Sequence, residues 1–322
     1  MTGGRGLPAY LLGRLARLVL VVLGVTALVF FLLRTVPGDP IRARYGIDTS
    51  LSQEDYAALR AEYGLDQPAP VQYVRWLQHA AKGDLGESIL QRRDVSHLLW
   101  KSGKVTLQVQ TASFLLALVV GVGAGSLAAI KAGSWTDRIL STVSLAGVAA
   151  PSYFLGILLI LLFAVRLDWL PVTGWHPLIP DVKEGLRHLA LPALTGALAG
   201  PVAVLLRYSR AALLEVLQQD YVRTARSKGL STTVVTLRHA LPNASVLILS
   251  VAGLMFANVL AGSVIIERLF TIPGMGRLVT EAVVQHDYPL VQGAVLVIAI
   301  VVVLVNTVVD LLYSFVDPRI RR

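Results

Sequence analysis

The residues best placed to do chemistry lie between positions 220 and 242, in a basic stretch that can form a helix between two apolar runs. Arg223 and Lys228 offer charges that pair with carboxylates, and Ala225 and Gly229 are small enough for another protein to approach closely. A loop of a simple pore has little need of an ordered amphipathic element. The stretch therefore predicts a protein that receives force from a soluble partner.

A helix here would place Tyr221, Ala225 and Leu230 on one apolar face, at spacings near four residues. Gly229 separates two helix-compatible pieces. Leu241-Pro242 then begins the next apolar run, because proline fits the first turn of a helix. We expect a short helix on the cytoplasmic surface, tied at both ends to membrane spans. The alternative is a solvated loop whose basic residues only stop membrane insertion.

Sequence signatures of enzyme chemistry are absent. There is no Gly-x-x-x-x-Gly-Lys-Ser/Thr phosphate loop, no His-Glu-x-x-His zinc motif and no Gly-x-Ser-x-Gly nucleophile turn. The chain has no cysteine, which excludes disulfides and thiolate metal sites. The six histidines fall in loops or at the ends of apolar runs, away from any buried haem or proton relay. We expect no catalytic residue, metal site or cofactor in this chain.

The composition indicates a membrane protein. Of the 322 residues, 55% are hydrophobic and 15% are charged, whereas soluble domains carry about 25% charged residues. Crossing a bilayer takes about 20 apolar residues. Six uncharged runs approach or exceed that length: 18–33, 105–130, 139–165, 189–206, 240–266 and 288–309. We therefore expect an all-α fold with six transmembrane helices; a cleaved signal peptide is the alternative for the first run.

The charge distribution predicts which loops are cytoplasmic. With the N-terminus inside, the inner segments together carry +9, the formal net charge of the whole chain. These segments are 1–17, 131–138, 207–239 and 310–322. Because short cytoplasmic loops are enriched in Lys and Arg, both termini are expected in the cytoplasm. Since the positive excess lies at membrane edges, the pattern argues against nucleic-acid binding.

The long segment 35–104 is predicted to be a helical extracytoplasmic insertion. Ser52 is a suitable N-cap with Asp55 three residues later, and Gly64 would end that helix. A second helix should begin at Pro70. The predicted domains are 1–34 with the first span, the insertion 35–104, and a five-helix core 105–322 that contains the coupling loop 207–242.

The stretch 220–242 resembles the coupling motif of ABC importer permeases: Glu-Ala-Ala, three residues, Gly, nine residues, Ile-x-Leu-Pro. Arg223-Thr-Ala stands in place of Glu-Ala-Ala, and His239 replaces Ile. Asp220-Tyr-Val-Arg-Thr-Ala-Arg-Ser-Lys-Gly-Leu is similar to the form found in the dipeptide, oligopeptide and nickel branch. The resemblance implies that the following residues couple the chain to an ATPase: Asp220, Tyr221, Arg223, Thr224, Ala225, Lys228, Gly229, Leu230, Leu241 and Pro242.

Six further stretches resemble the same family, in the same order, along nearly the whole chain. They are residues 31–40, 64–73, 83–88, 267–278, 287–293 and 310–321. Their order and the single long outer segment look like the B-type subunit, whose usual partner is a second, similar permease.

The resemblance implies a type I ABC importer permease fold and a place in a larger assembly. A second homologous permease would complete the pore. Two ATP-binding subunits, or one fused ATPase, would bring ATP and Mg²⁺ from the cytoplasm, and an extracytoplasmic substrate-binding protein would deliver di- or oligopeptides. A nickel or glutathione importer of the same branch is an alternative. The assembly would lie among the lipids of a bacterial or archaeal plasma membrane.

Two other groups are candidates for contact with substrate or receptor. Weakly polar span residues can hydrogen-bond a peptide backbone, although they often bond neighbouring helices instead. The path candidates are Ser113, Ser144, Ser152, Asn258, Ser263, Asn306 and Asp310. The candidates for an outer lid or receptor contact, or for an ordinary connector, are Glu267, Phe270, Pro273 and Gly274. Gly121-x-x-x-Gly125 predicts close helix packing.

A secondary transporter driven by an ion gradient is the alternative class. It predicts inverted repeats, broken helices within spans and intramembrane carboxylates. None of these is evident within the six runs. A membrane scaffold or receptor subunit that moves no substrate is a third class, which one chain alone leaves open.

Overall fold

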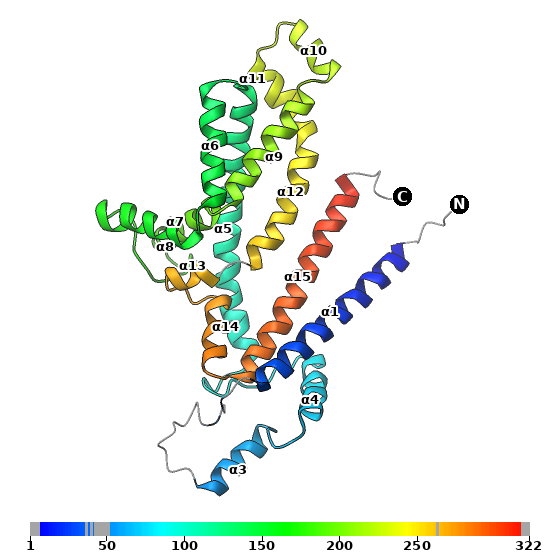
Figure 1. The fold of residues 1–322 in the computed structure, drawn as a ribbon, viewed down its shortest axis with the longest axis vertical. Helices are drawn as coiled ribbons and strands as arrows, with labels where there is room; N and C mark the ends of the chain where they lie inside the picture. Colours follow the sequence, from blue (N-terminus) through cyan, green and yellow to red (C-terminus); the bar gives the residue numbers. More distant parts are fainter. Residues whose placement is uncertain (1–6, 36–37, 39–40, 42–51, 262–263, 317–322) are drawn as a thin grey trace. The chain divides into compact units, whose positions relative to one another are not determined.

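The computed structural model describes residues 7–35, 38, 41, 52–261 and 264–316. Throughout these ranges the elements are helices joined by turns, with an isolated bridge between Glu87 and Asp94 (Figure 1). This all-α architecture confirms the predicted fold class. The helices form two compact units: unit 1 comprises residues 1–105 and 273–305, and unit 2 comprises 106–272 and 306–322.

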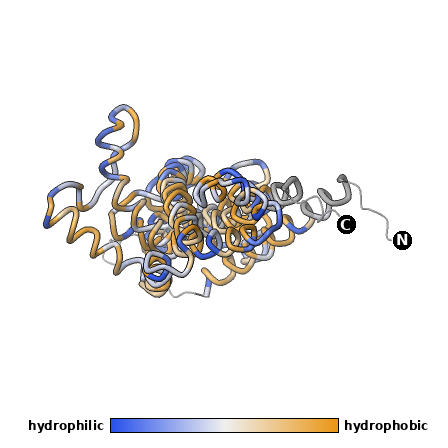
Figure 2. The backbone as a smooth tube through the Cα atoms, turned by 90° about the horizontal axis from the view of Figure 1, so that it is seen from above, coloured by the Kyte–Doolittle hydropathy of each residue, from blue (hydrophilic) through white to orange (hydrophobic). Residues whose placement is uncertain are grey.

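Four helices of the described chain are long and apolar enough to cross a membrane. They are Ala16–Thr35, Val95–Ile130, Thr232–Phe256 and Tyr288–Val308. Two bent helix pairs bring the number to six if each counts as one span: Trp135–Ala149 with Ser152–Arg166, and Val182–Leu198 with Pro201–Val216. Along the tube in Figure 2 the helices are mostly hydrophobic, with hydrophilic residues gathered in short stretches.

The bends correct the prediction that no span is broken. The first pair bends by 111° and the second by 52°. Pro151 begins the second helix of the first pair, and it holds Ala150 in an extended conformation that ends the preceding helix. Gly200 has a φ of +117° and precedes Pro201, so the second pair breaks for a similar reason.

Several helices of unit 1 begin and end where local sequence signals predict. Its elements are α1 (Leu7–Thr35), α3 (Gln53–Glu62), α4 (Ala69–Ala81), the start of α5 (Val95–Ile130), α14 (Met275–Val284) and most of α15 (Tyr288–Val316). The Asp55 amide donates to Ser52 Oγ at 3.0 Å, and Gly64 has a φ of +63°. Pro70 lies in the first turn of α4. Helix α5 begins at Val95, inside the predicted insertion 35–104, and continues into the following apolar run.

Tyr73 of α4 helps to hold the insertion against α1. The Tyr73 ring packs edge-on against Phe30, with the ring centroids 5.1 Å apart. Its hydroxyl lies 3.1 Å from Thr26 Oγ1 and donates to the Leu23 carbonyl at 3.2 Å. Because the ring and the hydroxyl both have partners, α4 has a defined position on α1.

A buried carboxylate ties the turn after α4 to the start of α15. Asp287 is 1% exposed and caps α15 by accepting from the Leu290 amide at 3.4 Å. It also accepts from the Ser88 hydroxyl and from the Ile89 and Leu90 amides. Residues separated by about 200 positions in sequence are thus joined by one side chain.

Asp287→Ala is expected to lower the free energy of unfolding by about 2–3 kcal/mol, because it leaves a buried hydroxyl and several amides without an acceptor. The matched control is Asp181→Ala. Asp181 is also an N-cap, but it is exposed, and among the described residues its side chain accepts only from the Glu184 amide, at 3.1 Å; about 1 kcal/mol is therefore expected. Unfolding of the solubilised full chain, followed by tryptophan fluorescence, measures both. Equal losses would contradict the bridging role of Asp287.

Unit 2 is built around α9. Its other elements are the rest of α5, α6 (Trp135–Ala149), α7 (Ser152–Leu159), the π-helix η1 (Ile160–Arg166), α8 (Val182–Leu198), α9 (Pro201–Val216), α10 (Asp220–Ser227), α11 (Thr232–Val234), the π-helix η2 (Val235–Ala240), α12 (Leu241–Ala261), α13 (Val264–Leu269) and the end of α15. Helices α6, α8 and α12 all pack against α9 (Figure 1).

Helices α5 and α9 approach each other closely at the predicted small-residue motif, Gly121-x-x-x-Gly125. A Cβ added to Gly121 would lie 2.7 Å from Leu205 Cβ, and one added to Gly125 would lie 2.6 Å from the Leu206 carbonyl oxygen. Neither position can hold a larger residue without moving α9. The structure therefore confirms that Gly121-x-x-x-Gly125 marks close helix packing.

Candidate functional site

The candidate site is α10 with the residues that join it to α9 and α12. The helix begins at Asp220, whose negative charge interacts favourably with the positive end of the helix dipole. The helix ends at Ser227, and Gly229 follows with a φ of +80°. Glycine is the residue that takes this left-handed conformation without strain, so it ends the helix cleanly. The predicted short helix and its glycine stop are confirmed.

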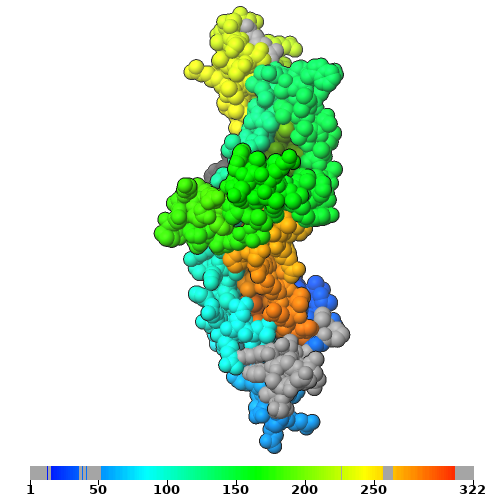
Figure 3. Space-filling model, turned by 90° about the vertical axis from the view of Figure 1, so that its left-hand side faces the viewer, coloured from blue at the N-terminus to red at the C-terminus, as the bar shows by residue number. Residues whose placement is uncertain are grey.

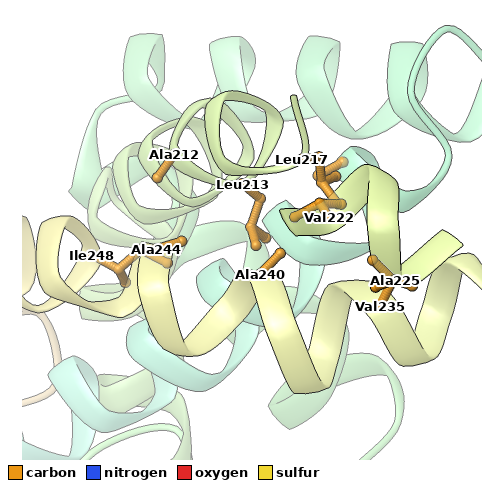
Figure 4. Packing of buried hydrophobic residues seen from close by; sticks show 10 residues of the cluster. Ala212, Leu213, Leu217, Val222, Ala225, Val235, Ala240, Ala244 and Ile248 are labelled. Carbon is orange, nitrogen blue, oxygen red and sulfur yellow. The ribbon is translucent and has the colours of Figure 1, made fainter. Parts of the chain in front are cut away.

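One side of α10 is fixed to its own chain. Val222 is fully buried and Ala225 is 9% exposed. Both belong to a hydrophobic cluster that includes Leu213 and Leu217 at and after the end of α9 and Val235 of η2. Figure 4 shows these side chains pointing toward one another from the three segments. A movement of α10 would therefore displace α9 and η2 with it.

The other side of α10 forms the α10 surface, which we define as Tyr221, Arg223, Thr224 and Lys228. All four are exposed, and the segment stands open to solvent at one end of unit 2 (Figure 3). Arg223 forms an ion pair with Asp220 at 3.5 Å, but both side chains are largely exposed and the pair contributes little stability. These charges are consequently available to another protein.

The predicted apolar face of α10 was wrong. Tyr221 and Leu230 are 45% and 40% exposed, whereas Ala225 is buried. The buried face instead follows Val222 and Ala225, three residues apart, because the cluster formed by α9 and η2 lies on that side. Ala225 therefore helps to attach α10 to α9 and η2 and is not part of the α10 surface.

Pro242 lies where the sequence predicts, in the first turn of α12, which begins at Leu241. The helical stretch extends back through η2 to Thr232, so the candidate span Thr232–Phe256 begins before Pro242. Proline removes one backbone donor from a helix. The wide turns of η2 immediately precede it, and the Asn243 side-chain amide donates to the His239 carbonyl at 2.7 Å. Such π segments often occur at functional positions. Leu241 packs against the same hydrophobic cluster as Ala225.

The sequence analysis did not predict an ion pair that joins α9, the helix before α10, to α6. Arg210 of α9 donates to both carboxylate oxygens of Asp137, from Nε at 2.6 Å and from Nη2 at 2.8 Å. Asp137 also accepts from the Gly133 amide at 2.9 Å and is 4% exposed. The pair fixes the turn before α6 to the helix that leads into α10. The sequence offered only one signal, an acidic residue within a basic loop.

The path candidates are dispersed. Ser113 and Ser144 are buried in unit 2 and donate to carbonyl oxygens of their own helices, those of Val109 and Ser141. Ser152 begins α7 and Asn306 is a half-buried residue of α15. Ser263 lies outside the described residues, as do the side chains of Asn258 and Asp310. A role of these residues in a path stays a prediction.

The lid candidates are not a surface group. Glu267 and Phe270 are 0% and 1% exposed. Glu267 accepts a hydrogen bond from Thr106 Oγ1 at 2.6 Å, and the Phe270 carbonyl accepts from the Gly174 amide at 2.9 Å. Both side chains therefore stabilise the interior of unit 2. Of the predicted group, Pro273 is exposed and Gly274 is buried.

Known proteins resemble the chain over nearly its full length. Residues 121–322 match the family model described as binding-protein-dependent transport system inner membrane component, and residues 7–91 match the model of its N-terminal part. The di/tripeptide transport system permease protein DppB of Pseudomonas aeruginosa is 40% identical, over 97% of this chain and 98% of that protein. The probable peptide ABC transporter permease protein y4tP of Sinorhizobium fredii is 39% identical, over 97% and 99%.

The fold is also shared with a solved transporter. A chain of the inward-facing MetNI methionine ABC transporter superposes with a TM-score of 0.53 at 18% identity, over 68% of this chain and 96% of that chain. At this identity the likeness concerns the fold alone, and it is the permease fold that the sequence predicts. The matched length, the apolar helices and the two family models lead to one conclusion. This chain belongs to the family of binding-protein-dependent transport system inner membrane components, and it is a multi-pass membrane protein.

Proposed function

We propose that this chain is the permease subunit of an ATP-driven ABC importer that carries di- or oligopeptides across the plasma membrane. The observation that carries the proposal is α10: a short helix whose inner side is packed on the permease and whose outer side presents Arg223 and Lys228. The peptide substrate is supported by relatives about 40% identical over nearly the whole chain whose names refer to peptide transport.

The proposed topology has six spans, with each bent helix pair counted as one, and both termini in the cytoplasm. The net charge of +9 is concentrated in the segments that this topology places inside. This topology puts α10 on the cytoplasmic side, where ATP is available. The insertion of unit 1 then faces the extracytoplasmic binding protein.

In the proposed cycle the catalytic work belongs to partner subunits. Two ATPase subunits, or one fused ATPase, hold ATP and Mg²⁺ and bind the α10 surface. A second permease homologous to this chain completes the pore, surrounded by membrane lipid, and no nucleic acid takes part. A partner can shift the balance between two packings of the spans only if it binds them with different affinities. Because Val222 and Ala225 are packed in one cluster with α9 and η2, a partner that binds α10 with different affinities in the two packings would also act on α9 and η2.

Affinity purification of this chain from its native membrane, followed by mass spectrometry, tests the proposal. We expect a second permease of the same family, one or two P-loop ATPases and an extracytoplasmic binding protein. The complex in proteoliposomes should then take up a labelled dipeptide only when ATP is supplied. A stable homo-oligomer without any ATPase would contradict the proposal and would favour a secondary transporter or a scaffold.

A role of Asn306 in the path predicts that Asn306→Cys reacts with small aqueous thiol reagents in at least one nucleotide state. Because the chain has no cysteine, the introduced thiol is the only one. Ser209→Cys is the matched control, since Ser209 is 0% exposed and a Cβ on Gly125 would lie 2.8 Å from its own Cβ. We expect labelling at position 306 to be at least tenfold faster. Equal protection of both thiols in every nucleotide state would remove Asn306 from the path.

A further inference from the structure

Unit 1 contains a cavity of about 260 Å³ that has no part in the coupling of α10. Its walls come from the end of α1, the end of α3, α4 and the start of α15. Several aromatic side chains line it, together with two arginines, one histidine and one glutamate. The aromatic residues are Phe30, Tyr63, Trp76 and Tyr288.

Arg34 gives this cavity a positive charge that no carboxylate of the described residues neutralises. Its guanidinium lies 3.4 Å from the centroid of the Phe30 ring, and it donates to the Phe30 carbonyl at 3.0 Å and to Gln72 Oε1. Within the described part of the chain no carboxylate pairs with it. An arginine held by stacking and by two neutral acceptors still has donors to offer in a planar fork that fits a carboxylate.

Trp76 supplies a rigid aromatic wall. It lines the same cavity, and its ring is held in place by stacking on Tyr73, at 6.2 Å between centroids. Tyr73 is itself fixed to α1.

The remaining lining residues define the rest of the ligand. Glu62, an exposed residue at the end of α3, contributes the negative charge that an ammonium group would pair with. The aromatic rings suit an apolar side chain. Sites for drug-sized ligands measure about 300–1,000 Å³, so this smaller cavity suits a few residues and not a long peptide.

We propose that this cavity is a site for short zwitterionic peptides on the permease itself. Arg34 binds the free α-carboxylate, Glu62 binds the α-ammonium group, and the aromatic rings, Trp76 among them, enclose a side chain. The identity of the ligand as a peptide rests on the proposed function. The geometry itself requires only a carboxylate next to a small apolar body.

The test is peptide binding to the full chain in lipid nanodiscs without the binding protein, measured by isothermal titration with Ala-Phe and with its C-terminal amide. We expect Ala-Phe to bind at least tenfold more tightly than the amide. Arg34→Gln should remove at least tenfold of the affinity for Ala-Phe, and Arg34→Lys about threefold, because lysine keeps the charge and loses the planar fork. Arg93→Gln, an exposed arginine of the same unit that does not line the cavity, is the matched control and should bind as the parent does.

Equal binding of the peptide and its amide, or unchanged binding by Arg34→Gln, would overturn the inference. Arg34→Lys guards against misfolding, because it keeps a positive charge at this position and removes only the planar fork. ATP-driven Ala-Phe uptake by the complete complex separates this inference from the proposed function. Uptake without binding at the cavity refutes the site alone, whereas absence of any peptide uptake refutes the proposed function. If Arg34→Gln impairs only stimulation by the binding protein, the cavity receives a carboxylate of that protein and the peptide site is refuted.

Discussion

Gly229→Val is expected to reduce ATP-driven transport more than tenfold while the chain still inserts into the membrane at parental levels. Gly229 has a φ of +80°, and nothing lies within 4 Å of the position that a Cβ would take. The added side chain therefore meets no atom of this chain. It strains the turn that ends α10 by about 1–2 kcal/mol, and it places bulk beside the α10 surface where the ATPase is proposed to bind. Uptake in proteoliposomes and membrane levels by immunoblot measure the two quantities.

The chain supplies a closely matched control at Gly83. Lys82-Gly83 follows the end of α4 as Lys228-Gly229 follows the end of α10, Gly83 has a φ of +87°, and it too has open space around a Cβ. Gly83→Val imposes the same strain away from the α10 surface, and more than half of the transport should remain. Equal losses at the two positions would show that backbone strain alone is responsible, which contradicts a contact role for Gly229.

An asparagine at position 229 distinguishes the effect of backbone strain from the effect of side-chain bulk. It tolerates the left-handed region better than other non-glycine residues. Gly229→Asn should therefore keep the end of α10 intact while still projecting a side chain at the contact. We expect transport to remain below a third of the parental rate, with ATPase co-purification weakened. Full activity would assign the role of Gly229 to the turn and not to the contact.

Breaking the Asp137–Arg210 pair should have the largest effect on stability. Removal of one partner of a buried ion pair costs about 3–5 kcal/mol. The Asp137 side chain is 6% exposed and that of Arg210 is 32% exposed, so the two single variants should differ. Arg210→Ala leaves a buried carboxylate and should cost about 3 kcal/mol, whereas Asp137→Ala leaves a partly hydrated guanidinium and should cost about 2 kcal/mol. Thermal unfolding of the solubilised chain measures both.

Arg207→Ala is the matched control, because Arg207 is an exposed arginine of α9 one turn earlier; it should change stability by less than about 0.5 kcal/mol. The double variant Asp137→Ala/Arg210→Ala should lose less than the sum of the single losses, because neither charge is left alone. Strict additivity, or a loss at Arg207 as large as at Arg210, would show that the bidentate pair has no special role.

Most of what the sequence predicts correctly depends on neighbours in the chain. The Ser52 cap, the stop at Gly64 and the start at Pro70 follow from backbone groups within a few residues of each other. The apolar runs and the concentration of positive charge likewise need no tertiary information, because bilayer thickness alone sets the length of a span. The motif from Asp220 to Gly229 is of the same kind, and its helix and glycine stop are where the sequence places them.

The remaining features depend on contacts between distant segments. Whether Tyr221 or Val222 faces inward is decided by where α9 and η2 lie, because a helix eight residues long can turn either side to a partner. Asp137 and Arg210 are 73 positions apart, and Ser88 and Asp287 are 199 apart, so no local pattern announces either bond. The sequence by itself determined the membrane class, most of the helices and the helix and glycine stop of α10. Only the tertiary structure decided which face of α10 is attached to the core, which charges are buried and where the spans bend, because these depend on packing that local propensity does not encode.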